Sequence, residues 1–519
     1  MSKPPQQAAS GADTEDLQAL AKGGRTNTMG FVVRLLGNAP FLFIGYRLYG
    51  VEEMGRFAFA LVIIEIIALI CALGEKRGLA QRLTEGVDSE GPESEKLKTN
   101  LVFDGMTASL ILSSVIAIIL LIFPSIMFPN GMNGPVDLIM IAAIPAFALT
   151  EILLAAQSYK YDIATTVRAR AVVEPWTKSI LVGACFYLPL LLTDAPWIRE
   201  GGLAIAFTAA IYAGLATAAW SFLRTYGLPV GWKPDGRYML EMSTRALPLV
   251  GADVIERGTR LIDLILLGIF TTEVAVGIYF FAKEIASLPQ KLKSSFEPIL
   301  SPVITKNLKK KNYTAIAAQI RQVGFWIIAL QAGIALALAI PGEAVMGLGG
   351  PAIVGGTGAL ALLLLAEVAA SMAVVSESVL VYMARKRNLL ISTCIIALQI
   401  ALTIGFIKLV DYLGWSDGFK AAGAAMALLI ALGVSSIVKA QFLKKLLGAP
   451  VSNWRIALVT AAAPAVVIGF LATLLPEWLE LLLGIPAILI TYGYVIWKRG
   501  FADEDRVLFR KNMGGPPAT

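Results

Sequence analysis

Long apolar runs recur along almost the whole chain, and each is close to the roughly 20 residues that an α-helix needs to cross a bilayer. They lie at 29–49, 56–74, 101–123, 136–156, 171–192, 201–223, 247–269, 275–295, 323–343, 357–381, 389–410, 418–440, 456–475 and 478–497. Only 16% of the residues are charged, whereas soluble domains are about 25% charged. The sequence therefore predicts an all-α polytopic membrane protein with about fourteen transmembrane helices.

Positive charge is distributed unevenly between alternate loops. Most of the 44 Lys and Arg residues fall on one set of loops. The few on the other set are Arg47, Arg56, Arg199, Lys408 and Lys420. Because loops rich in Lys and Arg stay on the cytoplasmic side, both termini are expected in the cytoplasm. The basic runs are short and juxtamembrane, which suits anionic lipid headgroups rather than a nucleic acid.

An internal repeat indicates two similar halves. Gly55-Arg-Phe-Ala-Phe-Ala60, near the first external loop, is similar to Gly277-Ile-Tyr-Phe-Phe-Ala282, which follows the seventh run. Weak internal symmetry of this kind is typical of transporters. The expected organisation is a flexible cytoplasmic tail (1–28), an N-lobe of six spans (29–223), a cytoplasmic linker (224–246), a C-lobe of six spans (247–445), an added helix pair (446–497) and a cytoplasmic tail (498–519). The first tail lacks the features of a cleaved signal peptide.

The run at 247–269 carries five charged residues on one side of a helix. They are Asp253, Glu256, Arg257, Arg260 and Asp263. An unpaired charge near the centre of a membrane helix costs about 2.5–3.5 kcal/mol, so this side must face other helices or a water-filled cavity. The i,i+4 pairs Asp253–Arg257 and Glu256–Arg260 would neutralise themselves. That alone does not explain charges at bilayer depth, and we favour a cavity lining.

Other spans carry single cations. Arg34 lies near the cytoplasmic end of the first run, where it either snorkels to the interface or acts in function beside Pro40, which allows the helix to bend. Lys178 forms an i,i+4 pair with Glu174. Lys283 and Glu284 are neighbours that point in different directions, so at least one needs a partner on another helix.

Three carboxylates in the spans have no cation nearby in sequence: Glu65, Glu367 and Glu377. Each either pairs with an Arg or Lys of another helix or is kept protonated by a raised pKa. Proton coupling would need the second state, and the first is the commoner one.

Several classes of chemistry have no residues to support them. The chain has no His, and its three Cys residues lie far apart in apolar runs, so neither a metal site nor His-dependent catalysis is expected. A Walker A loop is absent from the sequence, so transport would draw on an H⁺ or Na⁺ gradient rather than a bound cofactor. Every external loop is too short for a catalytic domain, so we expect no enzyme. Arginine forks at depth suit phosphate oxygens, which predicts a transporter of an anionic or amphiphilic substrate.

Three segments resemble a known family. Residues 47–60 (RLYGVEEMGRFAFA), 260–279 and 296–304 are similar to the corresponding stretches of Wzx-type polysaccharide flippases, which belong to the multidrug/oligosaccharidyl-lipid/polysaccharide (MOP) exporter superfamily. The resemblance implies two six-helix lobes in a V shape, with a central cavity that opens alternately to each side. It also implies transfer of a polyprenyl-pyrophosphate-linked oligosaccharide from the inner to the outer leaflet of the bacterial cytoplasmic membrane.

The resemblance implies a basic cavity, which fits Arg34, Arg257 and Arg260, and the charged residues of the other spans are further candidates. Those for the substrate are Arg34, Arg257, Arg260, Lys178 and Lys283. Those for ion coupling or structural pairing are Glu65, Asp253, Glu256, Asp263, Glu367 and Glu377. The implied partners are the lipid-linked glycan, the lipid bilayer and a polysaccharide polymerase with its chain-length machinery, and the protein itself is expected to be a monomer.

The added helix pair departs from the twelve-helix pattern and resembles the fourteen-helix lipid II flippases, where such a pair helps to hold the lipid tail. A lipid II flippase is therefore one alternative. A MATE-like multidrug antiporter is another, although it would want a carboxylate in the first span, which has only Arg34. A polyprenyl-dependent glycosyltransferase, polymerase or ligase would require a large external loop. The identity of the sugar stays open.

Overall fold

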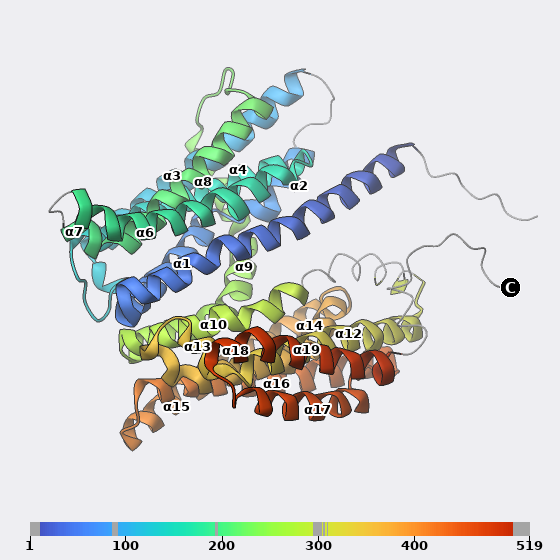
Figure 1. Cartoon of the computed structure of the whole chain (residues 1–519). Helices are drawn as coiled ribbons and strands as arrows, with labels where there is room; N and C mark the ends of the chain where they lie inside the picture. Colours follow the sequence, from blue (N-terminus) through green and yellow to red (C-terminus); the bar gives the residue numbers. More distant parts are fainter. Residues whose placement is uncertain are drawn as a thin grey trace, which may run out of the picture. The chain divides into compact units, whose positions relative to one another are not determined.

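Helices form all the regular secondary structure in the part of the chain that the computed structural model describes, residues 11–85, 92–192, 196–293, 304, 307–308 and 310–501. The chain divides into two compact units, residues 1–261 (unit 1) and 262–519 (unit 2). The boundary falls inside one long helix, α9 (Gly236–Phe270). Each unit is a bundle of long helices (Figure 1).

In the described part of unit 1, five long helices (α1, α3, α4, α6 and α8) and several short helical turns precede α9. In chain order its elements before α9 are α1 (Gly11–Cys71), α2 (Glu75–Glu85), α3 (Pro92–Ile122), η1 (Pro124–Ile126), η2 (Pro135–Ala142), α4 (Ala143–Tyr159), α5 (Ile163–Val167), η3 (Arg168–Val173), α6 (Glu174–Leu192), α7 (Pro196–Glu200) and α8 (Gly202–Tyr226). Its buried core joins α2, α3, α4 and α8 through apolar side chains such as Leu79, Val102, Ile152 and Phe222.

The first helix joins two of the predicted spans. α1 contains both 29–49 and 56–74 up to Cys71, and it is kinked at Gly50, whose φ of 88° and ψ of 170° are not helical. Glycine suits this position because a positive φ crowds any Cβ atom. The helix also begins earlier than expected, since residues 11–28 of the predicted flexible tail are helical. Strong helix formers in this stretch (Glu, Leu, Gln, Ala and Lys) account for the difference.

The expected linker between the lobes is partly helical too. α8 ends at Tyr226, and α9 begins at Gly236 and continues into the charged span, so only 227–235 is irregular. Asp235 precedes the helix and its carboxylate accepts a hydrogen bond from the backbone N–H of Arg237 at 2.9 Å.

Unit 2 begins within α9 and contains the remaining long helices. Its elements are α10 (Glu273–Lys293), α12 (Tyr313–Ala339), α13 (Gly342–Gly347), η4 (Pro351–Gly356), α14 (Thr357–Met383), α15 (Arg385–Leu413), α16 (Asp417–Leu447), α17 (Ile456–Ala472), α18 (Glu477–Leu479), η5 (Glu480–Gly484), α19 (Ile485–Val495) and η6 (Ile496–Gly500). One core cluster joins α12, α14 and α16, with Ile327, Val375 and Leu443 among its buried members.

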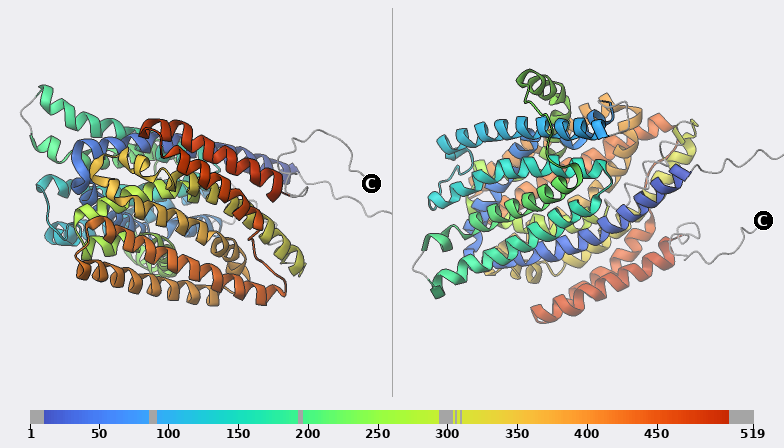
Figure 2. Two further views of the ribbon diagram at one scale, coloured as in Figure 1. Left: turned by 60° about the horizontal axis from the view of Figure 1, so that its bottom comes forward. Right: turned by 90° about the horizontal axis from the view of Figure 1, so that it is seen from above.

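The added pair of helices packs on α12. α17 and α19 lie side by side (Figure 2) and share a buried cluster with α12 that includes Phe325, Ala461 and Tyr492. Arg455, which directly precedes α17, also links the pair to its surroundings. Its guanidinium donates to the carbonyl oxygen of Gly500, at the end of η6, at 2.8 Å and lies 4.0 Å from the centre of the Phe325 ring of α12.

Nine of the described helices are long and apolar enough to cross a membrane, and one of them, 33–71, covers two predicted runs. The four other runs also form helices: α6, α9, α10 and the 17-residue α17. The charges of α9 and α10 explain why composition alone does not identify them as spans. The all-α membrane fold predicted from the sequence is confirmed.

Candidate functional site

The charged helix α9 does not keep its five charged residues in one environment. Asp253 is buried in unit 1, with 7% of the residue exposed, whereas Arg257 and Arg260 are exposed on the same helix. Asp263 is completely buried in unit 2. The side chain of Glu256 lies outside the described residues. The single polar side expected from the spacing is thus divided into accessible guanidinium groups and buried acids.

Asp263 is the centre of a buried polar cluster in unit 2. Its carboxylate lies 2.5 Å from the Lys283 ammonium of α10 and accepts a hydrogen bond from the Tyr279 hydroxyl. The backbone N–H of Leu264 donates to the same carboxylate at 2.9 Å. Glu367 of α14 is half-buried and lies close enough to Tyr279 to interact with it electrostatically. These side chains include two carboxylates and one ammonium, so they have the chemistry to take up a proton or a cation.

The need for an interhelical partner at Lys283 or Glu284 is confirmed by this contact. Lys283 is 21% exposed and neutralises an aspartate that has no exposed surface. Removing either member would leave the other charge in a poorly solvated place. Lys283 therefore has a structural role in addition to the substrate role proposed from the sequence.

Glu377 also forms an ion pair with a cation of another helix. Its carboxylate lies 3.3 Å from Lys439 of α16, and Asn388 of α15 donates to it at 3.5 Å. Lys439 is only 4% exposed and also donates to the Ser392 hydroxyl at 3.1 Å. Of the two states left open for this acid, the structure shows the ion pair. Lys439 lies at the end of the predicted span 418–440, and nothing in the sequence there indicates that it is buried or that it pairs with Glu377.

The remaining predicted residues lie in unit 1. Arg34 is exposed on the first half of α1, and Glu65 is half-buried on the second half. Lys178 of α6 is half-buried, and its ammonium lies 4.3 Å from the centre of the Phe41 ring of α1. Such a cation–π contact fits an ammonium held between helices. Substrate contact by these residues stays a prediction.

Unit 1 also contains a group of ion pairs that the sequence pattern did not predict. Arg170 lies in the π-helical turn η3 and contacts Glu151 of α4 at 2.5 Å and Glu174 of α6 at 2.8 Å. The sequence pairs Glu174 with Lys178 instead. The i,i+4 spacing of Arg170 and Glu174 is a signal that was available, but Glu151 belongs to another helix and only the fold brings it close.

Arg170, Glu151 and Glu174, the Arg170 group, link α4 to α6 through two ion pairs. The three side chains of Arg170, Glu151 and Glu174 are 14%, 24% and 17% exposed. The guanidinium also lies 4.3 Å from the centre of the Phe147 ring. A planar guanidinium can serve two carboxylates at once, which a lysine ammonium does less well. π-Helical turns are frequent at functional sites, so this group is a candidate for a role in transport.

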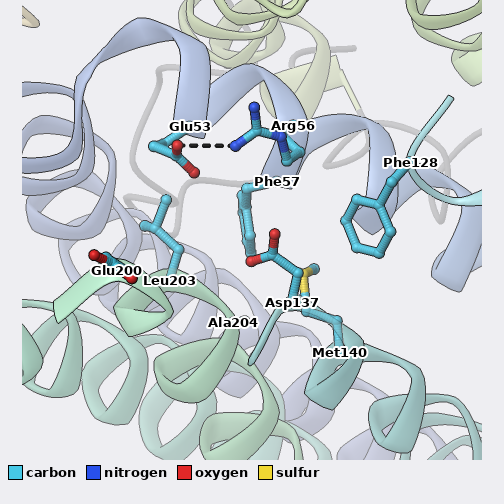
Figure 3. Close-up of a pocket in the computed structure, with 9 residues that line it drawn as sticks. All are labelled: Glu53, Arg56, Phe57, Phe128, Asp137, Met140, Glu200, Leu203 and Ala204. Carbon is cyan, nitrogen blue, oxygen red and sulfur yellow. Dashed lines mark hydrogen bonds and ion pairs between the residues drawn. The ribbon is translucent and has the colours of Figure 1, made fainter. Parts of the chain in front are cut away.

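The family-like motif at 47–60 builds a small polar pocket after the kink of α1 (Figure 3). Arg56 is 8% exposed and contacts Glu53 at 2.8 Å. Asp137 of η2 points into the same pocket and accepts a hydrogen bond from the backbone N–H of Asn133 at 3.2 Å. Phe57 and other apolar side chains complete the lining. Side chains of α1 just after the kink at Gly50 and of η2 therefore line the same pocket.

Metal-binding groups are missing from the described part of the chain, since no three Cys, Asp or Glu side chains there are arranged to hold an ion. The cysteines are free, with Cys71 and Cys185 buried and Cys394 exposed. Independence from a cofactor stays a prediction.

Comparison with known proteins agrees with this architecture. The family model described as polysaccharide biosynthesis protein matches residues 24–308. A solved structure of the lipid II flippase MurJ in an inward closed conformation is 12% identical, with a TM-score of 0.65 over 91% of this chain and 98% of that chain. An inward-facing multidrug resistance MATE family transporter of the MOP superfamily is 17% identical, with a TM-score of 0.62 over 80% of this chain and 98% of that chain. Among curated proteins, none matches this chain.

Proposed function

Because the chain belongs to the polysaccharide biosynthesis protein family and has the MOP fold, we propose that it flips a polyprenyl-pyrophosphate-linked oligosaccharide from the inner to the outer leaflet of the bacterial cytoplasmic membrane. The observation that carries this proposal is the family match, which begins at residue 24 within α1, covers the other described helices of unit 1 and continues through α10. Both termini lie in the cytoplasm in this proposal, in agreement with the distribution of Lys and Arg.

A transporter is needed for such a cargo because of its headgroup. Each unpaired polar group of a multi-sugar headgroup costs several kcal/mol to bury in hydrocarbon, roughly 4–8 kcal/mol for a hydroxyl or amide moved from water to an alkane. The pyrophosphate adds charge to that cost. Arg34, Arg257 and Arg260 are exposed on membrane helices and offer guanidinium forks that can bind phosphate oxygens in pairs. We assign the pyrophosphate to these arginines.

The energy for directional transport would come from an ion gradient. The Asp263 cluster of unit 2 combines a completely buried carboxylate, the half-buried Glu367 and the ammonium of Lys283. A change in protonation there would alter the contacts between α9, α10 and α14. We propose that H⁺ or Na⁺ acts at this cluster and that alternating access of the transporter follows.

The cargo leaves unaltered in this proposal, so the protein is not an enzyme. A lipid II flippase is the second candidate, because MurJ is described as one and its structure matches 91% of this chain. Polymerase and chain-length proteins would act after the transfer.

Lipid analysis of a deletion strain tests the function. Mass spectrometry of polyprenyl lipids should show an intact lipid-linked oligosaccharide that accumulates, and membrane-impermeant periodate should fail to oxidise it from outside. Accumulation of lipid II would favour the second candidate. Truncated or unpolymerised sugar on the outer face would contradict a flippase and point to an enzyme.

A further inference from the structure

The inner face of α15 in unit 2 carries polar residues among the buried apolar residues Ile395, Ile407 and Val410. α15 packs mainly against α16 (Figure 1) and turns a narrow face toward it. Four residues at helical spacing on this face are polar: Asn388, Ser392, Gln399 and Thr403. At 1.5 Å per residue they extend over about 22 Å, which is most of the thickness of the hydrocarbon core.

Two residues deep on this face have unmet hydrogen-bonding groups. Gln399 is 1% exposed and Thr403 is 0% exposed. Within the part of the chain that the structure describes, neither amide atom of Gln399 nor the hydroxyl of Thr403 has a hydrogen-bond partner. The exposed Thr393 of the same helix donates to the carbonyl oxygen of Leu389 at 3.0 Å. A threonine hydroxyl on α15 can therefore donate to a backbone carbonyl oxygen of the same helix. The hydroxyl of Thr403 does not make this bond.

The other end of the face joins the buried ion pair of Lys439 and Glu377. Lys439 donates to Ser392 at 3.1 Å and lies 3.3 Å from Glu377, whose side chain is 45% exposed. Asn388 is 6% exposed, and its carbonyl oxygen has no hydrogen-bond partner among the described residues. Polar groups thus lie at both ends of this face, from the accessible carboxylate of Glu377 to the buried amide of Gln399, with the buried Ile395 between Ser392 and Gln399.

We propose that the interface between α15 and α16 is a hydrated seam, in which water enters beside Glu377 and Asn388 and reaches Gln399 and Thr403. Buried polar groups without protein partners are bonded to ordered water in most proteins. Such a chain of water molecules would form hydrogen bonds with the unpaired polar groups of Asn388, Gln399 and Thr403 and would hydrate Lys439. It also gives a proton or a small hard cation an oxygen-lined route into unit 2. This goes beyond the proposed function, because it assigns a water and ion path to α15 and α16.

Thiol accessibility tests the seam in the full-length protein. Gln399→Cys and Thr403→Cys are made separately in a transport-competent version without Cys71, Cys185 and Cys394, and are treated with 2-aminoethyl methanethiosulfonate, which reacts with thiolates in water. One matched control is Ala401→Cys, on the exposed face at the same depth. The other is Ile407→Cys, on the inner face one turn beyond Thr403 and 1% exposed. We expect positions 399 and 403 to react at least tenfold faster than both controls. Equal rates at 399, 403 and 407 would overturn the proposal.

Apolar replacement provides a second test that does not depend on the cysteine variants. In the wild-type background, Gln399→Leu with Thr403→Val removes the partners of the water chain, so we expect reduced transport without a higher melting temperature. In a dry interface the same change would remove unmet polar groups. A higher melting temperature with unchanged transport would therefore overturn the hydrated seam.

Discussion

At the scale of single residues, buried charges in this protein are held by partners from other helices. Asp263 meets Lys283, Glu377 meets Lys439, and Arg170 meets Glu151. The sequence shows that such charges need partners, because an isolated one is costly in a membrane. It does not show which residue is the partner, since that depends on how the helices pack.

The Asp263–Lys283 pair gives a first prediction. Lys283→Met should lower the free energy of unfolding by about 3–5 kcal/mol, because it leaves the buried carboxylate without its cation. Adding Asp263→Asn should recover part of the loss, as expected for residues in contact. Thermal melting of the purified protein measures both effects. Lys408→Met, at an exposed lysine, is the control and should change stability little. A single variant as stable as the control would remove the structural role of the pair.

The Arg170 group gives a second prediction. Arg170→Lys keeps the charge but loses the fork that serves Glu151 and Glu174, so it should cost about 1.5–3 kcal/mol of stability, the range for a hydrogen bond to a charged group. The neighbouring Arg168 is exposed on the same turn, and Arg168→Lys is the matched control. If the two variants melt at the same temperature, the guanidinium geometry does not matter.

At the scale of elements, the sequence predicted each long helix but not the places where helices join. The runs 29–49 and 56–74 are correct as apolar segments, yet α1 continues through the kink at Gly50 and carries both. The π-helical turn at Arg168–Val173 has no signature in the apolar pattern. Length and hydropathy identify an apolar segment, whereas a kink at one glycine or a single π-helical turn leaves both quantities unchanged.

The sequence repeat has a structural counterpart in the burial of its residues. Phe57 and Ala58 of the first copy are 3% and 0% exposed, and Tyr279 and Phe281 of the second copy are both 0% exposed. Both copies therefore provide core residues just after a turn. The charges differ, because Phe57 lies beside Arg56 and Asp137, whereas Tyr279 donates to Asp263. Shared packing with different polar partners explains why the repeat is visible but weak.

The packing of the added helix pair gives a third prediction. A Cβ atom at Gly333 of α12 would lie 2.9 Å from the Tyr492 ring of α19, whereas one at Gly493 would have no neighbour within 4 Å. Gly333→Ala should therefore cost about 1–3 kcal/mol through overpacking. Gly493→Ala should cost nothing or stabilise slightly through helix propensity. Melting temperatures compare the two variants, and equal values would show that α12 and α19 are not packed tightly.

At the scale of the whole molecule, the protein is a membrane transporter of two units, the second of which includes the added pair of helices. The predicted site is less complete than the predicted fold. The sequence identified Asp263, Lys283 and Glu367, which the structure gathers in unit 2, but it grouped Asp263 with Arg257 and Arg260 on one polar side. Helical spacing gave that grouping, and the burial of Asp263 beside α10 overrode it.

Charge removal at the exposed arginines gives a fourth prediction. Arg34→Ala, Arg257→Ala and Arg260→Ala should each reduce flipping while the protein still inserts normally, because a pyrophosphate would lose a bidentate partner. Lysine at the same positions should restore only part of the activity, since an ammonium lacks the fork. Surface polysaccharide at matched protein levels is the readout. Full activity of all three alanine variants would remove these residues from the substrate path.

We propose that this protein transfers a lipid-linked glycan across a bilayer without changing it. The most direct measurement uses the purified protein in liposomes that contain a polyprenyl-pyrophosphate-linked oligosaccharide, with membrane-impermeant periodate outside. We predict that the protein, with an ion gradient imposed, raises the fraction of glycan oxidised above the half reached in protein-free liposomes, and that the mass of unoxidised cargo is unchanged. An oxidised fraction equal to that of protein-free liposomes, at verified incorporation, would show that the protein does not transfer the glycan. A cargo of altered mass would show that the protein changes it.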